Sequence, residues 1–482
     1  MGREEQIIQQ RLKKLKELRD KNINPYPNNF DKKFLIEKCL KSKLGTSVKT
    51  AGRLMTKRDI GKIIFANLRD GSGDIQLVFK KGETPEKHIK FFKKYMYIGD
   101  FVGVSGKTFK TRTGQRSILV NDLKLLTKAI LPLPEKFHGL QDQEELLRKR
   151  YLDILLNKET RDLFEKKAIF WRTIREFLLK KGFIEVETPI LEASAGGAAA
   201  EPFKTHHNAL DTDVFLRIST GELWQKKLMV GGYERTFEIG RQFRNEGMDA
   251  EHLQDYTQME FYMAYANYKD GMKLTEEMYK KVAKKVLGTL KFKSGKYTVD
   301  LGKKWKVYDY EKLIKDKTGI DIFKDDVKKI RKKLDSLNVV YDKKQGKWRL
   351  IDVLWKVCRK ELSGPGFLTG QPVQLAPLAK KNPKDPRKVE QFQIIIAGSE
   401  MGNGYSELND PLDQEERFKE QMKLKKSGDS EAQEHDESFV EALKYGMPPV
   451  CGFGLSERLF SVMMNRPIRE TVFFPLMKPE NS

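Results

Sequence analysis

Residues 237–262 have the sequence FEIGRQFRNEGMDAEHLQDYTQMEFY, two strand-like runs joined by a polar loop that contains a glycine. If 237–246 forms a strand, the alternation of side chains places Arg244 and Glu246 on one face. On the returning strand one face carries Tyr256, Gln258, Glu260 and Tyr262. A hairpin built in this way can present both sets of side chains to one ligand.

The side chains of this hairpin suit a nucleotide. The fork of Arg244 matches the oxygen pair of a phosphate or a carboxylate. The carboxylate of Glu246 can accept hydrogen bonds from an amino group such as that of adenine. Tyr256 can stack on a base, and His252 in the loop can reach outlying phosphates. The alternative is a surface hairpin crossed by salt bridges, and these residues alone leave both interpretations open.

Two more stretches combine glycines with charged side chains. Residues 451–464, CGFGLSERLFSVMM, place glycines before an apolar helical run with Arg458, which can meet a purine or a phosphate. Residues 397–418, AGSEMGNGYSELNDPLDQEERF, hold carboxylates and an amide that suit magnesium or an ammonium group, namely Glu400, Asn403 and Glu407. Packing alone explains the first stretch equally well, and a solvated loop explains the second.

The composition of the chain indicates what the protein binds rather than how it folds. The chain has 482 residues, enough for two or three domains, and a formal net charge of +24 from 92 basic and 68 acidic residues. Such an excess favours a polyanion, nucleic acid first and an anionic membrane surface second, although a lysine-rich solvated surface is equally compatible. The three cysteines lie far apart, so neither a zinc site nor a disulfide framework is indicated. Without a signal peptide or an apolar membrane span, the sequence predicts a cytoplasmic protein with no membrane partner.

The chain divides by its patterns. Residues 1–47 form an extension with an amphipathic helix at 4–21. Residues 48–127 contain five short β-rich runs and a lysine-rich helical segment at 86–97, which match an OB-fold. A Pro-rich connector at 128–145 leads to a second domain at 146–482, which begins with a long helix stopped by Gly182 and a strand, IEVETPIL. The lysine-dense segment at about 271–348 is interpreted as a peripheral insertion.

These stretches, in this order, resemble the motifs of the class II aminoacyl-tRNA synthetases. FRNE at 243–246 is similar to motif 2, GFGLSERLF at 452–460 to motif 3, and the long helix with GFIEVETPIL to motif 1. The resemblance is strongest to the lysine-specific members and runs from about residue 48 to Pro479. It includes the stretches GGAAAEPFKTHHNALD, MEFYMAYANY, GNGYSELNDP and FFPLMKP. It implies an α+β chain, an OB-fold anticodon-binding domain before a catalytic antiparallel sheet flanked by helices, normally a homodimer.

The resemblance also implies roles for individual residues. ATP would be bound with Mg²⁺ by Arg244, Glu246, His252, Tyr256, Glu400 and Arg458, of which Arg244 and Arg458 carry the catalytic role. Glu246 would take the adenine amino group, Tyr256 and Arg458 the two faces of the ring, His252 the terminal phosphates and Glu400 the magnesium. L-lysine would be bound by Gly197 and Glu222 at its α-amino group, by Arg244 and Asn403 at its carboxylate, and by Glu260, Tyr262 and Glu407 at its distal ammonium. A buried ammonium needs opposite charge and full hydrogen bonding, which two carboxylates and a tyrosine hydroxyl provide.

In the barrel the resemblance places Arg58, Phe65, Gln76 and Gln115 at the tRNA anticodon, with Phe65 stacking on a base. Without the resemblance, Phe65 would be read as barrel core and Arg58 as solvated. Some positions depart from the family pattern. Gln393 stands where a second magnesium-binding glutamate is usual, and Gln115 where many relatives have a glutamate. One extra residue precedes Glu222, and Trp224 replaces a common tyrosine.

The reaction implied has two steps. The lysine carboxylate attacks the α-phosphorus of ATP and releases pyrophosphate, and the terminal ribose hydroxyl of tRNA then attacks the adenylate and releases AMP. Catalysis comes from alignment and from charge stabilisation rather than from a side-chain nucleophile. Two alternatives are a class II enzyme for aspartate, asparagine or a modified lysine, and a paralogue that binds tRNA without catalysis. Glu260 and Glu407 favour lysine over aspartate and asparagine, because an aspartate site would need a basic residue there.

Overall fold

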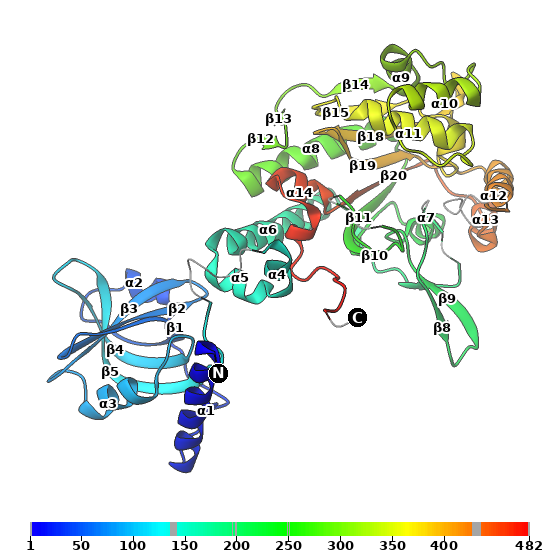
Figure 1. Cartoon of the computed structure of the whole chain (residues 1–482). Helices are drawn as coiled ribbons and strands as arrows, with labels where there is room; N and C mark the ends of the chain where they lie inside the picture. Colours follow the sequence, from blue (N-terminus) through cyan, green and yellow to red (C-terminus); the bar gives the residue numbers. More distant parts are fainter. Residues whose placement is uncertain are drawn as a thin grey trace. The chain divides into compact units, whose positions relative to one another are not determined.

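The computed structural model describes residues 2–134, 142–194, 196–197, 200–247, 249, 251–426 and 435–480. The chain forms two compact units, Met1–Gln141 and Asp142–Ser482. Figure 1 shows the smaller unit in blue and cyan, and the larger one from cyan to red. Among the described residues, no helix has the length and apolar character that a membrane crossing requires.

The smaller unit is a closed barrel of five strands in the order β1-β2-β3-β5-β4. The strands are β1 (Ser47–Asp59), β2 (Ile63–Asp70), β3 (Gly73–Lys80), β4 (Phe101–Lys110) and β5 (Arg116–Thr127), with α3 (Glu86–Tyr95) between β3 and β4. Alternate residues of each strand point inward, so Ile64, Ala66 and Leu68 of β2 are buried in the barrel core. The predicted OB-fold is thereby confirmed, with its helix in the expected place.

Two N-terminal helices, α1 (Arg3–Asp20) and α2 (Ile36–Lys41), pack on the barrel. Leu18 and Ile36 join the barrel core. The guanidinium of Arg11 is buried and donates hydrogen bonds to the carbonyls of Ile98, at 3.2 Å, and of Leu131, at 2.9 Å. The predicted amphipathic helix is therefore part of the barrel unit, fixed by both apolar packing and backbone hydrogen bonds.

The larger unit is built on an eight-stranded sheet in the order β14-β15-β18-β19-β20-β11-β10-β6, antiparallel except for the two outermost pairs. Its strands are β6 (Ile184–Glu185), β10 (Arg235–Phe243), β11 (Asp255–Ala264), β14 (Lys306–Asp309), β15 (Gly366–Thr369), β18 (Gln391–Ile396), β19 (Ser399–Ser406) and β20 (Val450–Ser456). The α+β class and the antiparallel sheet flanked by helices are confirmed.

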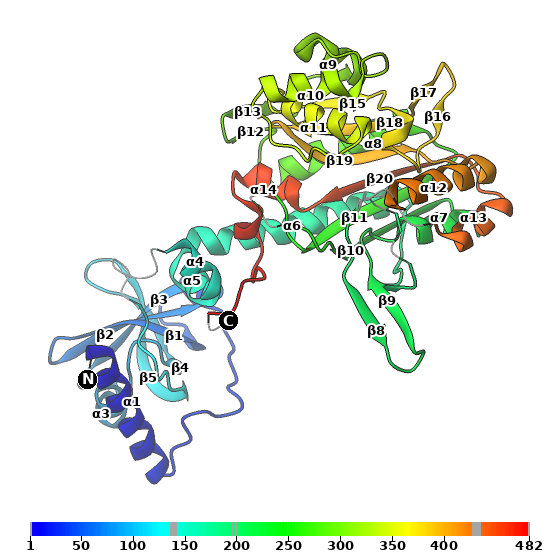
Figure 2. The ribbon, with the colours of Figure 1, turned by 45° about the vertical axis from the view of Figure 1, so that its right-hand side comes forward.

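Small sheets and two single turns surround this sheet. They are β7 (Leu191–Glu192), β8 (Lys204–His207) and β9 (Thr212–Leu216) in one sheet, β12 (Lys291–Ser294) with β13 (Tyr297–Asp300), and β16 (Lys381–Asn382) with β17 (Asp385–Val389). The turns are the 3-10 helices η1 (Val373–Leu375) and η2 (Ile468–Thr471). Figure 2 shows the β8–β9 hairpin projecting from the body of this unit.

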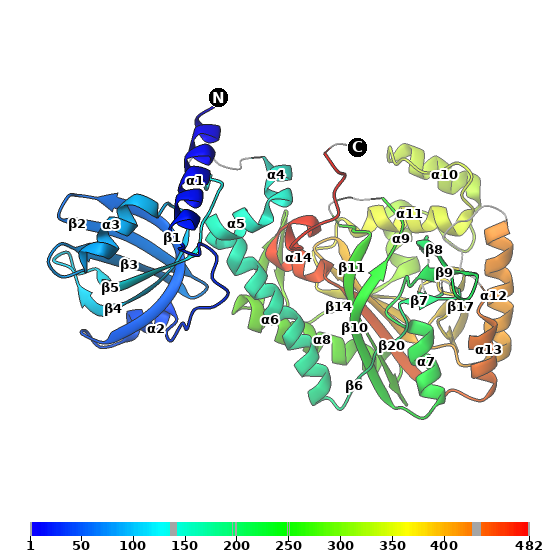
Figure 3. The same ribbon diagram turned by 90° about the horizontal axis from the view of Figure 1, so that it is seen from below.

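One face of the large sheet is apolar and is covered by α6 (Lys158–Lys180) and α8 (Tyr268–Leu287), which lie side by side (Figure 3). Phe237, Phe261, Phe453 and Phe392 lie on this face and belong to one buried core with residues of both helices. The sequence pattern placed residues 271–348 in a peripheral insertion, but 271–287 form most of α8. They belong to the core because Met278, Val282 and Val286 share its apolar side.

The remaining helices close the ends of the sheet. A separate core holds α9 (Tyr310–Thr318), α10 (Val327–Ser336) and α11 (Lys347–Arg359) against the β15–β18 edge. Another core holds α7 (Glu222–Val230), α12 (Pro411–Lys426) and α13 (Glu437–Lys444) together. Helices α4 (Gln143–Arg148) and α5 (Arg150–Leu156) precede α6, and α14 (Arg458–Met464) follows β20.

The predicted strand IEVETPIL forms only in part. Two of its residues, 184–185, pair with β10 in parallel, and its last residue, Leu191, pairs with β9 in another sheet, together with Glu192. Pro189 lies between these pairs, and proline has no N–H to donate to a ladder. The chain therefore leaves the large sheet within this stretch.

Candidate active site

The second face of the large sheet is polar over its central strands. Register places one row of side chains across it, in the order Gln393, Asn403, Gly454, Glu260 and Glu238. The next row on the same face is Gln391, Tyr405, Gly452, Tyr262 and Thr236. Residues directly opposite one another in neighbouring strands point to the same side, so these rows form the floor of one site.

Glycines in β20 leave room above this floor. A Cβ atom at Gly452 would overlap both Oε1 of Glu407 and the ring of Tyr262, and a Cβ at Gly454 would lie 3.2 Å from Cγ of Glu260. The glycines therefore allow acidic and aromatic side chains from the neighbouring strands to meet over the middle of β20.

Glu260 lies in this space, and its carboxylate accepts three hydrogen bonds. Its Oε1 accepts hydrogen bonds from the amide N–H of Thr220, at 2.8 Å, and from Nε2 of Gln258, at 2.6 Å. Its Oε2 accepts one from the hydroxyl of Tyr262, at 2.9 Å. Burial, with repulsion from Glu222, raises the pKa of Glu260 to about 7, although these hydrogen bonds oppose the rise. The predicted shared face of Tyr256, Gln258, Glu260 and Tyr262 is confirmed by the strand register.

Glu407 follows β19 and is 2% exposed. Its Oε2 lies 2.5 Å from the ammonium nitrogen of Lys226, a residue of α7 that the sequence pattern did not single out. Burial raises the pKa of Glu407 to about 8, against the attraction of Lys226. Both predicted carboxylates for the distal ammonium are therefore buried and interact with each other, and one of them is already paired with a cation.

Glu222 begins α7 and is also buried. Its Oε1 accepts hydrogen bonds from Nζ of Lys226, at 2.8 Å, and from the hydroxyl of Tyr405. The residue before it, Gly221, has a positive φ of 71°, and this turn lets the N–H of Thr220 reach Glu260. Glu222 is therefore buried next to Lys226 and Tyr405, at the start of the helix.

Gly197 and Asn403 lie at the same site. Gly197 has φ of 86°, and a Cβ there would lie 2.7 Å from the hydroxyl oxygen of Ser219 and 3.0 Å from Cβ of Glu222. Only glycine allows the backbone to come this close to the start of α7. The side chain of Asn403 points to the polar face and accepts a hydrogen bond from Nε2 of Gln391, at 2.8 Å.

Arg244 does not lie on a strand, contrary to the expectation for residues 237–246. β10 ends at Phe243, so Arg244 and Glu246 lie in the loop that follows and strand alternation does not apply to them. Nε of Arg244 donates to the carbonyl of Ile218, at 3.3 Å, and its guanidinium lies 5.8 Å from the centre of the Tyr256 ring. Glu246 is exposed, and His252 is exposed beside the carboxylate of Asp249, at 2.8 Å.

Arg458 begins α14, and its Nε donates to the carbonyl of Glu251 in that loop, at 3.2 Å. The carboxylate of Glu251 accepts a hydrogen bond from the hydroxyl of Ser399 at the start of β19, at 2.8 Å. These contacts bring three segments together that are far apart in the sequence, the loop after β10, the start of α14 and the start of β19. The ring of Tyr256 packs beside them against Ile468 and Val472.

Two predicted magnesium ligands lie at the start of β19 and in β18. Burial raises the pKa of Glu400, while Arg359 and Arg458 act in the opposite direction. Nη1 of Arg359 lies 3.9 Å from Oε2 of Glu400. Oε1 of Gln393 is buried and has no hydrogen-bond partner among the described residues. Carboxylate and amide oxygens of this kind fit a magnesium ion as ligands.

The four residues predicted for the anticodon lie in the other unit and share the outer surface of the barrel. Register aligns Arg58 with Phe65, and Gln76 with Ser117. Phe65 is half-buried and is not part of the barrel core. The alternative interpretation, that Phe65 is a core residue, is therefore wrong. Nε2 of Gln76 donates to Oε1 of Gln115, at 3.1 Å, and Oε1 of Gln76 accepts from Ser117, at 2.8 Å.

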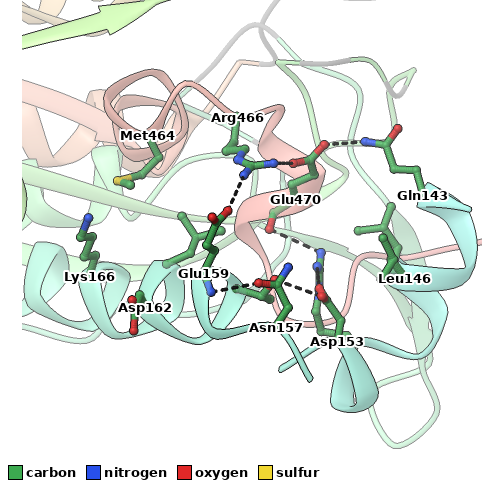
Figure 4. A pocket seen from close by; sticks show the side chains of 14 residues that line it. Gln143, Leu146, Asp153, Asn157, Glu159, Asp162, Lys166, Met464, Arg466 and Glu470 are labelled. Atoms are coloured by element: carbon green, nitrogen blue, oxygen red, sulfur yellow. Dashed lines mark hydrogen bonds and ion pairs between the residues drawn. The ribbon is translucent and has the colours of Figure 1, made fainter. Parts of the chain in front are cut away.

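The larger unit also has a cleft near its N-terminal helices (Figure 4). It is formed by α4, α5 and the start of α6 on one side and by residues 464–470 on the other. Figure 4 shows Glu470 between Arg466 and Gln143, and Nη1 of Arg466 lies 3.2 Å from Oε2 of Glu470. None of the residues predicted for ATP or lysine is among the described residues that line it. The polar face of the sheet is therefore the better candidate for chemistry.

Two family models match the chain. Residues 142–478 match the tRNA synthetases of class II (D, K and N), and residues 48–126 match the OB-fold nucleic acid binding domain. Similar proteins include the lysine–tRNA ligase of Thermosipho melanesiensis, 43% identical over 98% of this chain and 95% of the relative. The lysine–tRNA ligase of Thermotoga maritima is 43% identical over 98% and 96%, and that of Aquifex aeolicus is 45% identical over 90% and 73%.

Proposed function

Because this chain belongs to the class II tRNA synthetases and, within them, to the lysine–tRNA ligases, it is an enzyme that charges tRNA with lysine, and we propose that it does so through a lysyl-adenylate formed on the polar face of its large sheet. The observation that supports this site is a set of three buried carboxylates, of which Glu260 and Glu407 lie against two glycines of β20 and Glu222 lies against Gly197. A buried group of carboxylates suits a long cationic amino acid.

In the proposed complex the distal ammonium of lysine lies between Glu260, Glu407 and Tyr262. Its α-ammonium meets Glu222 beside Gly197, and its carboxylate meets Asn403 and Arg244. The pocket contains one cation of its own, Lys226, but three carboxylates exceed one ammonium. That balance opposes aspartate and asparagine, neither of which carries a distal positive charge.

ATP is proposed to bind where the loop after β10 meets α14 and β19. The adenine ring lies between Tyr256 and Arg458, its amino group donates to Glu246, and His252 approaches the terminal phosphates. In the first step a carboxylate oxygen of lysine forms a bond to the α-phosphorus while the bond to pyrophosphate breaks. Arg244 stabilises the charge on the α-phosphoryl oxygens, and the site holds both reactants in line.

In the second step the terminal ribose hydroxyl of tRNA attacks the carbonyl carbon of the adenylate, and AMP leaves. Magnesium is proposed to accompany ATP, held by Glu400 with Gln393 as a weaker oxygen ligand, and to offset phosphate charge. An amide has no negative charge, so we expect a higher magnesium requirement than a second glutamate would give. A magnesium titration of the exchange reaction measures it.

The partners proposed are a lysine-accepting tRNA, with its anticodon on Arg58, Phe65, Gln76 and Gln115, and a second copy of the chain. Apolar side chains around the end of α6 and the short edge strand β6 support a homodimer, because Leu179, Ile184, Ile190 and Leu191 are exposed. Light scattering that gives the mass of a single chain would contradict the dimer. The tRNA substrate also leads us to expect a cytoplasmic enzyme, which cell fractionation tests.

The decisive experiment is amino-acid-dependent exchange of pyrophosphate into ATP. We expect exchange with lysine and none with aspartate or asparagine. Arg244→Ala should abolish exchange and leave tRNA binding largely intact, because it removes the group that meets the α-phosphate. Arg241→Ala is the matched control, since Arg241 lies in the same hairpin but is exposed and paired with Asp255. Undiminished exchange in Arg244→Ala would remove Arg244 from its role.

A further inference from the structure

Lys226 lies among the buried carboxylates Glu222 and Glu407, but the proposed function gives it no role. It is 1% exposed, and its ammonium nitrogen lies 2.8 Å from Oε1 of Glu222 and 2.5 Å from Oε2 of Glu407. The rings around it have their centres at 6.0 Å, 5.4 Å and 5.7 Å, and belong to Tyr262, Tyr405 and Phe439. One ammonium group therefore links carboxylates from two different elements, α7 and the segment after β19.

Lys226 contacts one oxygen of each of two carboxylates. It touches one oxygen of Glu407, and the other oxygen, Oε1, lies above Gly452 next to the ring of Tyr262. It also touches one oxygen of Glu222. Glu260, the third carboxylate, is instead held by Thr220, Gln258 and Tyr262.

We propose that Lys226 is a positioning residue for the amino acid substrate, which fixes the spacing of Glu222 and Glu407 and thereby the length of the diamino acid that the site accepts. The proposal rests on the proposed function, because these are the two carboxylates assigned to the α-ammonium and the distal ammonium of lysine. A side chain that joins both carboxylates restricts each of them, so the distance between the two ammonium positions is set before the substrate arrives.

The charges of the pocket agree with this role. When all three carboxylates are ionised, the one internal ammonium leaves two negative charges for the two ammonium groups of lysine. Burial lowers the pKa of Lys226, but Glu222 and Glu407 outweigh it, and the pKa lies above its ordinary value. The other titratable groups that act on this cluster are Glu260, Tyr262, Tyr405 and Cys451. Removing the cation should raise the pKa of Glu407 further, because the attraction of Lys226 opposes its rise.

The test compares Lys226→Met, which keeps the length of the side chain without its charge, with Lys226→Arg, which keeps the charge. Lysine-dependent exchange is measured from pH 6.5 to 9, together with the KM for ATP and the melting temperature. Lys227→Met is the matched control, because Lys227 lies next in α7 but outside the pocket, over Trp224 and hydrogen-bonded to Ser438. Ornithine, shorter than lysine by one methylene, serves as a second substrate.

We expect Lys226→Met to raise the KM for lysine about tenfold or more at pH 7, with a partial recovery at pH 9 and an unchanged KM for ATP. The preference for lysine over ornithine should fall, and Lys226→Arg should restore most of it. An unchanged lysine KM across the pH range, or a lower one, would overturn the proposal. If Lys226→Met does not fold, failure of Lys226→Arg to keep a near-native lysine KM overturns it. Absence of lysine-dependent exchange in the unmodified enzyme would instead refute the proposed function.

Discussion

At the scale of single residues, the proposed lysine site predicts that lysine binding depends on pH. Their pKa values, about 7 for Glu260 and about 8 for Glu407, are raised from 4.5 mainly by burial. An ammonium group binds the ionised carboxylates, so affinity for lysine is gained as pH rises through this window and lost below it. The KM for lysine should therefore fall several-fold from pH 6 to pH 8.5, while the KM for ATP changes less.

The same shifts act on stability with the opposite sign. A carboxyl group whose pKa is higher in the folded chain binds more protons when folded, so the empty enzyme loses stability as pH rises from 4.5 through the folded values. Bound lysine should relieve this loss, and the rise in melting temperature on adding lysine should be larger at pH 8 than at pH 6. A lysine KM that stays constant from pH 6 to 8.5 would contradict the raised pKa values.

How much of the site the sequence could predict depended on the local structure around each residue. The alternation of a regular strand placed Glu260 and Tyr262 together correctly. It failed for Arg244, because β10 ends one residue earlier and the loop, rather than a strand, sets its direction. Lys226 gave no signal, since a Glu–Lys pair four residues apart in a helix is typical of a solvent-exposed face. Its burial depends on strands and helices distant in the sequence.

At the scale of elements, a buried ion pair links α6 to the start of α14. The ammonium of Lys167 pairs with Glu457 and donates to the carbonyl of Thr471, at 2.7 Å. The carboxylate of Glu457, 0% exposed, also accepts from the N–H of Thr257 in β11, at 3.1 Å. This carboxylate therefore joins α6 and β11 at the residue that precedes Arg458.

We expect Glu457→Gln to lower the free energy of unfolding by about 3 kcal/mol, because it leaves the ammonium of Lys167 buried without a counter-charge. It should also raise the KM for ATP more than the KM for lysine, since Arg458 is displaced and the acidic pocket is not. The double variant Lys167→Met with Glu457→Gln should recover part of the stability, as both charges are then absent. Chemical denaturation measures this, and equal stability of Glu457→Gln and the unmodified enzyme would refute the role of the pair.

Helices and strands were predictable where the spacing of apolar residues within the element itself indicated its structure. Helix α6 follows from the spacing of Phe170, Ile174 and Phe177, which lie on its buried side. The many lysines of 271–287 indicated a peripheral segment, although α8 is part of the core. Charged residues on one side of a helix give no information about whether its other side is apolar and buried. The strand expected at 184–191 is divided between two sheets, a tertiary arrangement that no local pattern records.

At the scale of the whole molecule, the proposed function assigns two tasks to two different units of the chain. The net charge of +24 favours a polyanion but does not say which unit binds it. The acidic pocket lies in the larger unit, and the outward-facing Phe65 with Gln76 lies in the smaller one. Amino acid activation and recognition of the tRNA should therefore respond to different substitutions.

Phe65→Ala tests this separation. Loss of a base-stacking ring costs about 1–3 kcal/mol, so the kcat/KM for tRNA charging should fall roughly tenfold or more, while lysine-dependent exchange stays unchanged. Phe101→Ala is the matched control: Phe101 is also a half-buried phenylalanine of the barrel, but it lies on β4 with Arg53 over its ring, 4.3 Å from the ring centre. Its loss should affect stability rather than the KM for tRNA. If Phe65→Ala charges tRNA as well as the unmodified enzyme does, the outer face of β2 does not contact the anticodon. The surface that binds the anticodon must then lie elsewhere in the chain.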